Sequence, residues 1–411
     1  MKKLLVLLSA LLLCTSCSYN ADEEETEVQT LNVSDEAYYK QLEGKNISIN
    51  VYNWGEYISD GSDEGTLDVN AEFTELTGIK VNYSTYATNE ELYAKLKGNS
   101  SSYDIIIPSD YMISRMIEED MLEKIDFNNV PNFKNITETF VNPEYDPKNE
   151  YSVPYTWGTV GIIYDKTAID EADIDWDILW DEKYKDQILM FDNPRDAFAV
   201  AALKKGYSLN TENTDEIAEE ADELSKQKEL VQAYVMDEIF DKMGAGEALL
   251  APYYAGDAIT LMDEYDHLGF VIPKSGTNLF FDAMCIPKNA REKKAAEMYI
   301  NFMCEPDIAY ATTTYIGYST PNSAAFEMLD DDVKNDGISY LDDDYLSEHT
   351  ETFINLSNEA NRFMQDKWTE MKSKNDEAKN TWLVPLFMLL CVFTSIGIII
   401  ARYAKRKKDI F

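Results

Sequence analysis

The sequence predicts an α/β protein with two lobes. From residue 44 onward, short apolar strands alternate with helical segments, the order typical of sheets covered by helices. One strand, Y-D-I-I-I-P at 103–108, is a continuous apolar run, as expected in a parallel sheet that is buried on both faces. The chain has 411 residues, enough for more than one hydrophobic core. Two lobes are therefore the expected organisation.

The N-terminus has the features of an export signal. Two lysines precede the apolar run 4–13, which is too short to span a membrane. The run ends at L-C-T-S-C, where small residues stand before Cys17 as in a bacterial lipobox. We therefore expect a lipoprotein-type signal peptide over 1–17 with Cys17 lipidated; cleavage without a lipid is the alternative. Residues 18–43 are interpreted as an acidic tether.

The first α/β unit begins with a strand at 47–51, in which apolar and polar residues alternate. The strand runs into N-W-G-E-Y at 53–57, a polar turn with a glycine. Further elements follow in alternation, namely a helix at 67–76, a strand at 79–86, a helix at 90–96, the strand at 103–108 and a helix at 112–122. Right-handed crossovers bring the ends of the first and third strands to one edge of the sheet, where ligands bind in open α/β sheets. We expect Trp54, Glu56 and Tyr57 to face Ser109, Asp110 and Tyr111 there.

The residues of the 53–57 turn allow two interpretations. An aromatic face beside a carboxylate suits an organic cation, through cation–π attraction and charge-assisted hydrogen bonds. Alternatively, Trp54 anchors the core and Glu56 is a solvated turn residue. The turn by itself leaves both open.

A second α/β unit is predicted to begin near residue 151. Its strands are expected at 160–164, 188–191, 248–252, 269–272 and 281–286. In the rest of the chain, helices are expected at 197–205, 216–225, 291–302 and 351–371, and a further helix is expected to begin near Asp257. Asp196 stands at the start of the helix at 197–205, where an acidic residue complements the helix dipole.

The C-terminal segment has the pattern of a membrane span. Residues 382–401 are uncharged and apolar, and about 20 residues at helical rise cross a hydrocarbon core of roughly 30 Å. Basic residues follow directly, which predicts a cytoplasmic tail over 402–411. We therefore expect a linker at 374–381 and a transmembrane helix at 382–401, with a buried core helix as the alternative.

Composition and the absence of known motifs exclude several classes of function. A formal net charge of −40 argues against nucleic acid and against an anionic ligand, and it agrees with a cationic ligand. His267 and His349 lie in separate segments, and Cys285 and Cys304 are expected to be buried thiols, so no metal site is predicted. The sequence contains no G-x-S-x-G, H-E-x-x-H, P-loop or G-x-G-x-x-G motif. Neither an enzyme nor a cofactor is predicted.

Seven segments carry a family resemblance when they are taken together and in order. They are Y-N-W-G-E-Y (52–57), T-G-I-K-V (77–81), Y-A-K-L-K (93–97), Y-D-I-I-I-P-S (103–109), V-P-Y-T-W-G (153–158), I-N-F-M-C-E-P-D-I-A (300–309) and I-G-Y-S-T-P-N (316–322). Over 47–371 the chain resembles the bacterial polyamine-binding proteins of ABC importers, the spermidine/putrescine-binding type. The resemblance implies a type II periplasmic-binding-protein fold, whose two lobes close on a ligand by a hinge motion. With crossings near Pro154 and Ile286, lobe 1 is expected to comprise 44–153 plus 287–325, and lobe 2 154–286 plus 326–373.

The resemblance also implies which residues bind the ligand. Those of the first lobe are the aromatic Trp54 and Tyr57, the ammonium partner Glu56, and the polar contacts Ser109 and Tyr111. Those that follow along the chain are the principal carboxylate Asp282, the second carboxylate Asp196, and the aromatic Tyr254, Phe280 and Tyr318. Carboxylates would pair with the ends of a polyammonium chain and aromatic rings would cover its methylenes, because an unpaired buried charge is costly.

Three positions depart from the family pattern. Gly55 replaces a hydroxyl residue, Asn193 stands where an acid can occur, and Asp196 is one methylene shorter than the usual glutamate. Losing an acid weakens the match to a triamine. The resemblance thus leaves open whether putrescine, spermidine or both are bound.

The sequence therefore predicts a receptor outside the bacterial cell membrane that binds a polyamine and delivers it to an ABC permease. It is expected to be attached to the membrane through Cys17 and the 382–401 helix. Two alternatives stay open: a binding protein for another cationic or small polar solute, and an extracellular sensor or adhesion protein on the same fold.

Overall fold

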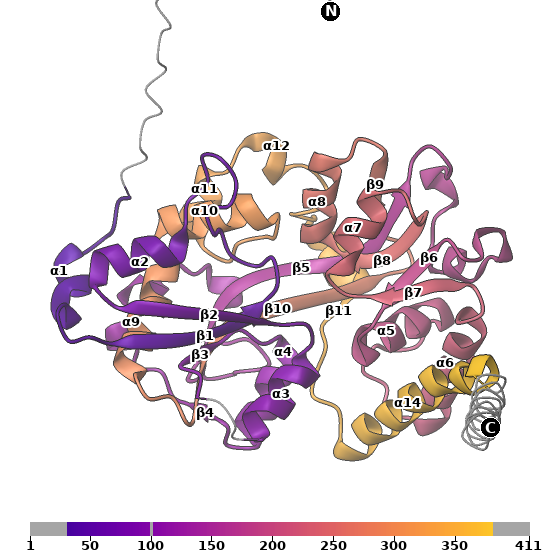
Figure 1. Ribbon diagram of the computed structural model, residues 1–411, viewed down its shortest axis with the longest axis horizontal. Helices are drawn as coiled ribbons and strands as arrows, with labels where there is room; N and C mark the ends of the chain where they lie inside the picture. The colour runs from indigo at the N-terminus through magenta and orange to yellow at the C-terminus, as the bar shows by residue number, and fades with distance from the viewer. Residues whose placement is uncertain (1–30, 99–101, 381–411) are drawn as a thin grey trace, which may run out of the picture. The chain divides into compact units, whose positions relative to one another are not determined.

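The structure, a computed structural model, describes residues 31–98 and 102–380. The chain divides into two compact units, residues 1–32 and residues 33–411. Of the first unit only Leu31 and Asn32 are described. The fold that follows is that of the second unit (Figure 1).

Eleven strands form the sheet of the described residues. They are β1 (Ser48–Trp54), β2 (Lys80–Tyr86), β3 (Ile105–Ile106), β4 (Leu122–Glu123), β5 (Ser152–Asp165), β6 (Ile188–Phe191), β7 (Val231–Val235), β8 (Leu250–Tyr254), β9 (Leu268–Val271), β10 (Thr277–Pro287) and β11 (Thr350–Glu351). The order along the sheet is β2-β1-β3-β10-β5-β8-β6-β7, with β4 and β11 paired to β10 and β9 paired to β5. The pairs β1/β2, β1/β3, β6/β7 and β6/β8 are parallel, as the alternation of strands and helices predicts.

The helices of the described residues accompany these strands along the chain. They are α1 (Glu36–Tyr39), α2 (Val69–Thr77), α3 (Asn89–Lys97), α4 (Asp110–Glu118), α5 (Pro194–Lys205), α6 (Thr214–Gln227), α7 (Glu238–Gly244), α8 (Ala255–Glu264), α9 (Lys293–Met303), α10 (Pro306–Ile316), α11 (Ser323–Met328), α12 (Asp331–Lys334), α13 (Asp343–His349) and α14 (Asn358–Asn380). Short 3-10 helices occupy several connections.

Local sequence signals explain where the helices around the pocket begin. The side chain of Thr88 caps α3 by accepting a hydrogen bond from the backbone of Glu91, so the helix begins one residue before the predicted start at 90. In α5, Asn193 caps the helix and Pro194 occupies its first turn, where the missing N–H costs nothing. Gly206 ends α5 in the left-handed conformation, with φ 71°.

Two long antiparallel strands, β5 and β10, join the two sets of parallel strands (Figure 1). The first part of β5 pairs with β10, and its last part, from Val160 onward, pairs with β8 and β9. At the other side, Cys285 of β10 pairs with Ile106 of β3. The middle of β5 and β10 therefore lies between the β1–β3 set and the β6–β8 set, and every residue of β5 is buried.

The transmembrane part of the predicted fold class is corrected. Within residues 31–98 and 102–380, no helix is both long enough and apolar enough to cross a membrane. The segment 382–401, for which such a helix was predicted, lies outside the described residues. The fold class is therefore stated without a transmembrane helix.

The helix predicted at 351–371 is wrong in its first part. Residues Thr350 and Glu351 form β11 beside β10, and α14 begins only at Asn358. The Glu351 carboxylate accepts hydrogen bonds from Ser208, Leu209 and Asn210, which holds this stretch extended. Phe353 of the extended stretch reaches the pocket described next.

Candidate functional site: a pocket between the two sets of strands

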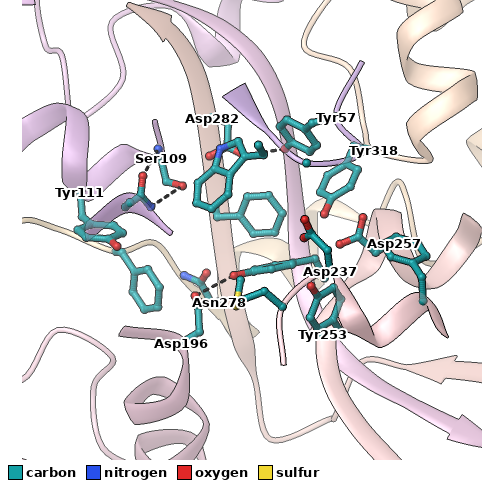
Figure 2. A pocket seen from close by; sticks show the side chains of 18 residues that line it. Tyr57, Ser109, Tyr111, Asp196, Asp237, Tyr253, Asp257, Asn278, Asp282 and Tyr318 are labelled. Carbon is teal, nitrogen blue, oxygen red and sulfur yellow. Dashed lines mark hydrogen bonds between the residues drawn. The ribbon is translucent and has the colours of Figure 1, made fainter. Parts of the chain in front are cut away.

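A pocket opens beside the middle of β10, between the ends of β1 and β3 and the end of β8 (Figure 2). It encloses about 640 Å³ of empty space, counted to its open mouth. Its lining includes nine of the ten residues expected to bind a ligand, namely Trp54, Tyr57, Ser109, Tyr111, Asp196, Tyr254, Phe280, Asp282 and Tyr318.

The turn after β1 places Trp54 and Tyr57 in the pocket. The Trp54 indole Nε1 donates a hydrogen bond to the backbone oxygen of Ile107, 2.8 Å away, which fixes the ring at the end of β3. Glu56 adopts a positive φ of 45° in this turn. Its side chain is exposed and does not line the pocket, unlike the arrangement expected from the sequence.

Asp282 lies in β10 at a break in the pairing with β5. The register shifts between Asp282 and Ala283, and such a bulge re-aims a side chain. The Tyr57 hydroxyl donates to Asp282 Oδ2 over 2.6 Å. Asp282 Oδ1 is buried and has no hydrogen-bond partner among the described residues. One carboxylate oxygen is therefore available to a donor that enters the pocket.

Asp196 is held from two sides at the start of α5. The amide of Asn193 and the hydroxyl of Tyr254 both donate to its Oδ2, over 2.5 and 2.8 Å. Asn193 also caps the helix by accepting a hydrogen bond from the backbone of Arg195, so the same side chain caps α5 and orients Asp196. Asp282 and Asp196 project into the same pocket from different elements (Figure 2).

Aromatic rings form the walls. The rings of Tyr254 and Phe280 meet edge to face at 5.5 Å, and those of Tyr57 and Tyr318 at 4.7 Å. Edge-to-face contacts of this kind add stability beyond their buried area. Gly158 leaves room for Phe280, because a Cβ at this position would lie 2.9 Å from the ring. The walls are therefore fixed by packing before any ligand enters.

Burial makes the pocket carboxyls weaker acids than usual. It raises the pKa of Asp282 to about 6, against the opposing influence of the neighbouring Ser109 and Tyr57 hydroxyls. Burial also raises the pKa of Asp196 to about 7, although the hydrogen bond from Tyr254 opposes this shift. The pKa of Asp257 rises to about 8, again mainly through burial, with the charge of Asp237 adding to the effect. None of the 18 residues drawn as the lining within the described chain is lysine, arginine or histidine. The nearest cation is the buried guanidinium of Arg195, which lies behind the lining rings of Tyr111 and Phe353 and partly offsets the charge of Asp196.

The sequence did not single out all of the lining residues. Asp237, Asp257, Tyr253 and Asn278 also face the pocket (Figure 2). Asp237 was missed because neither β7 nor α7 was predicted, so the junction between them had no place in the expected fold. Asp257 was placed at a helix start, three residues after Tyr254, and that spacing was the available signal.

The side chains that line the pocket can bind a cation. Within the described residues, no group of three or more histidine, cysteine or acidic side chains is arranged to hold a metal ion. What the walls offer is an unpaired buried carboxylate oxygen, further carboxyls and aromatic faces.

Comparison with known proteins decides the family. The family of bacterial extracellular solute-binding proteins matches residues 100–349. The chain belongs to this family. Because its members bind solutes and do not transform them, the prediction that this solute-binding protein is not an enzyme is confirmed, and so is its extracytoplasmic location.

The relatives of this solute-binding protein agree with the resemblance seen in the sequence. The chain is 39% identical over 304 residues to the spermidine/putrescine-binding periplasmic protein of Salmonella typhimurium, covering 74% of this chain and 85% of the relative. It is 30% identical over 344 residues to a putrescine-binding periplasmic protein of Pseudomonas aeruginosa, covering 79% and 92%. The solved spermidine/putrescine ABC transporter substrate-binding protein of Streptococcus pneumoniae superposes with a TM-score of 0.66 at 35% identity, covering 80% and 99%. The two-lobed periplasmic-binding-protein fold is thereby confirmed.

Proposed function

We propose that this solute-binding protein is the receptor of an ABC importer, binds a polyamine in the pocket, and delivers it to the permease in the membrane. The relatives named above support the solute class and the transporter. The observation that carries the proposal is the buried, unpartnered Asp282 Oδ1 in a pocket without a cationic wall. An ammonium group supplies both the missing hydrogen-bond donor and the missing charge.

The aromatic walls suit the rest of such a ligand. A polyamine alternates ammonium groups with methylene chains, and aromatic faces attract the charged groups while covering the apolar ones. Asp282 and Asp196 would hold two ammonium groups, with Trp54, Phe280 and Tyr254 along the chain between them. Ser109, Tyr57, Tyr111 and Tyr318 complete the proposed contacts. Glu56 is exposed, and we propose that it acts through its charge rather than by contact.

Binding is proposed to close the two lobes, with boundaries at 44–153 plus 287–325 and 154–286 plus 326–373. The passage of β5 and β10 between the two sets of strands supports this division. Pocket residues come from both sets, so a ligand that contacts Trp54 and Tyr254 together favours the closed form by its differential contacts.

Titration calorimetry of the purified chain with putrescine, cadaverine, spermidine and spermine tests the ligand class. We expect saturable one-site binding of at least one of these amines. 1,4-Butanediol, which has the length of putrescine without its charges, is the matched control and should not bind. Binding of the diol, or of none of the amines, would contradict the proposal.

Membrane attachment through Cys17 is a separate proposal, and this residue lies outside the described part of the chain. It rests on the small residues before Cys17 at the end of the apolar leader. Cells fed labelled palmitate should label the wild-type protein, while Cys17→Ser should lose the label and Cys14→Ser should keep it. Equal labelling of wild type and Cys17→Ser would contradict the proposal.

A further inference from the structure

Gly55 and Asp237 meet across the pocket from the two sets of strands. Gly55 follows β1, whereas Asp237 stands between β7 and α7. A Cβ added to Gly55 would lie 2.3 Å from Asp237 Oδ2 and 3.1 Å from its Cγ. Contacts of a Cβ below 3.0 Å essentially do not occur in proteins. Only a residue without a side chain at position 55 lets the Asp237 carboxylate stay where it is.

The backbone gives no other reason for glycine at this position. Gly55 is not among the glycines with a positive φ, so an alanine could adopt its conformation. The turn strain is instead carried by Glu56, which has a φ of 45°. The role of Gly55 is therefore steric: it lacks a side chain, and the Asp237 carboxylate occupies the space that a side chain would fill.

Asp237 adds negative charge to one end of the pocket. Asp237 and Asp257 lie close together at that end, and Asp196 lies at the opposite end (Figure 2). Partial burial and the nearby charges of Glu56 and Glu238 raise the pKa of Asp237, and its charge in turn raises the pKa of Asp257. A cation placed beside both carboxyls would offset the effect of Asp237 on Asp257 and favour the ionised form of each.

We propose that Asp237 is a specificity-determining residue that binds an additional ammonium group of a longer polyamine. The absence of a side chain at Gly55 leaves the space that the Asp237 carboxylate occupies. This inference rests on the proposed function. A diamine has two ammonium groups, for which Asp282 and Asp196 suffice. A triamine has a third, and Asp237 together with Asp257 provides a place for it.

A double-mutant cycle tests the proposal through the ratio of spermidine affinity to putrescine affinity. Asp237→Ala is expected to lower spermidine affinity about ten-fold, the scale of one charge-assisted hydrogen bond at a partly exposed site, and to change putrescine affinity less than about three-fold. Gly55→Ala should have nearly the same effect, because the new methyl group turns the short Asp237 side chain away. The double variant should match Asp237→Ala within about two-fold, since the carboxylate is lost only once.

Two controls separate charge from folding. Asp241→Ala removes an exposed carboxylate from the same helix, α7, and should leave both affinities unchanged. Ligand-free melting temperatures should be similar in all five proteins. Additive losses in the cycle, or equal losses for putrescine and spermidine, would overturn the inference while leaving polyamine binding intact. Failure of the wild type to bind either amine would instead overturn the proposed function and this inference with it.

Discussion

Asp282→Asn is expected to weaken polyamine binding more than any other single substitution in the pocket. Asparagine keeps the size of the side chain and an acceptor for the Tyr57 hydroxyl, but it removes the charge that pairs with an ammonium group. Truncating one partner of a buried charged pair costs about 2–5 kcal/mol, which corresponds to a rise in Kd of about 30-fold to several thousand-fold. Titration calorimetry of wild type and variant with the preferred polyamine measures this rise in Kd.

The melting temperature of the Asp282→Asn variant shows whether a loss of binding comes from misfolding. Burial disfavours the ionised form of Asp282 in the ligand-free protein, so a neutral asparagine should leave the melting temperature unchanged or raise it. The matched control is Asp192→Asn, which removes an exposed carboxylate paired with Lys372 at 2.8 Å outside the pocket. A variant at position 282 that retains wild-type affinity would remove this residue from the site.

Affinity is also expected to fall steeply in acid. The pocket carboxyls have pKa values of about 6 for Asp282, about 7 for Asp196 and about 8 for Asp257 in the ligand-free protein. A bound ammonium group favours the ionised forms, so binding releases protons and tightens as the pH rises toward 8. For Asp196 alone, lowering the pH from about 8 to about 5.5 implies a loss of about 30-fold. Calorimetry in two buffers with different ionisation enthalpies measures both the affinity and the protons released.

Stability of the ligand-free protein should depend on pH with the opposite sign. The folded pKa of Asp196 lies above the ordinary value, so this residue favours the folded state at low pH, and that contribution is lost as the pH rises through about 7. The melting temperature without ligand should therefore fall from pH 5.5 to 8, while the shift caused by ligand should grow. Asp196→Asn should flatten the pH profile of binding. A profile that is flat in the wild type, or unchanged in this variant, would contradict the assignment.

The elements that line the first part of the pocket could be predicted from local sequence patterns. Alternation in 47–51 and the glycine-containing turn after it located β1 and Trp54, and the apolar run before Ser109 located β3. These signals are local because a strand end and a helix start depend on neighbouring residues. Asp282 and Tyr318 were reached only through the family resemblance, since nothing in their own segments indicates a pocket.

The longer-range features depended on contacts that a sequence does not display. The strand predicted at 160–164 is part of β5, Ser152–Asp165, whose start contains Pro154 and Gly158, residues that ordinarily argue against a strand. Here the glycine is required because the ring of Phe280 occupies the space of a side chain. Asp237 is a similar case: its place in the pocket depends on the absence of a side chain at Gly55, 182 positions away in the sequence.

A crystal structure of the protein with its preferred polyamine tests the central claim most directly. We predict an ammonium nitrogen about 2.7–2.9 Å from Asp282 Oδ1, the distance of a charge-assisted hydrogen bond, with the methylene chain lying against Trp54 and Tyr254. A ligand bound elsewhere, or a pocket in which Asp282 Oδ1 still lacks a partner, would contradict the account.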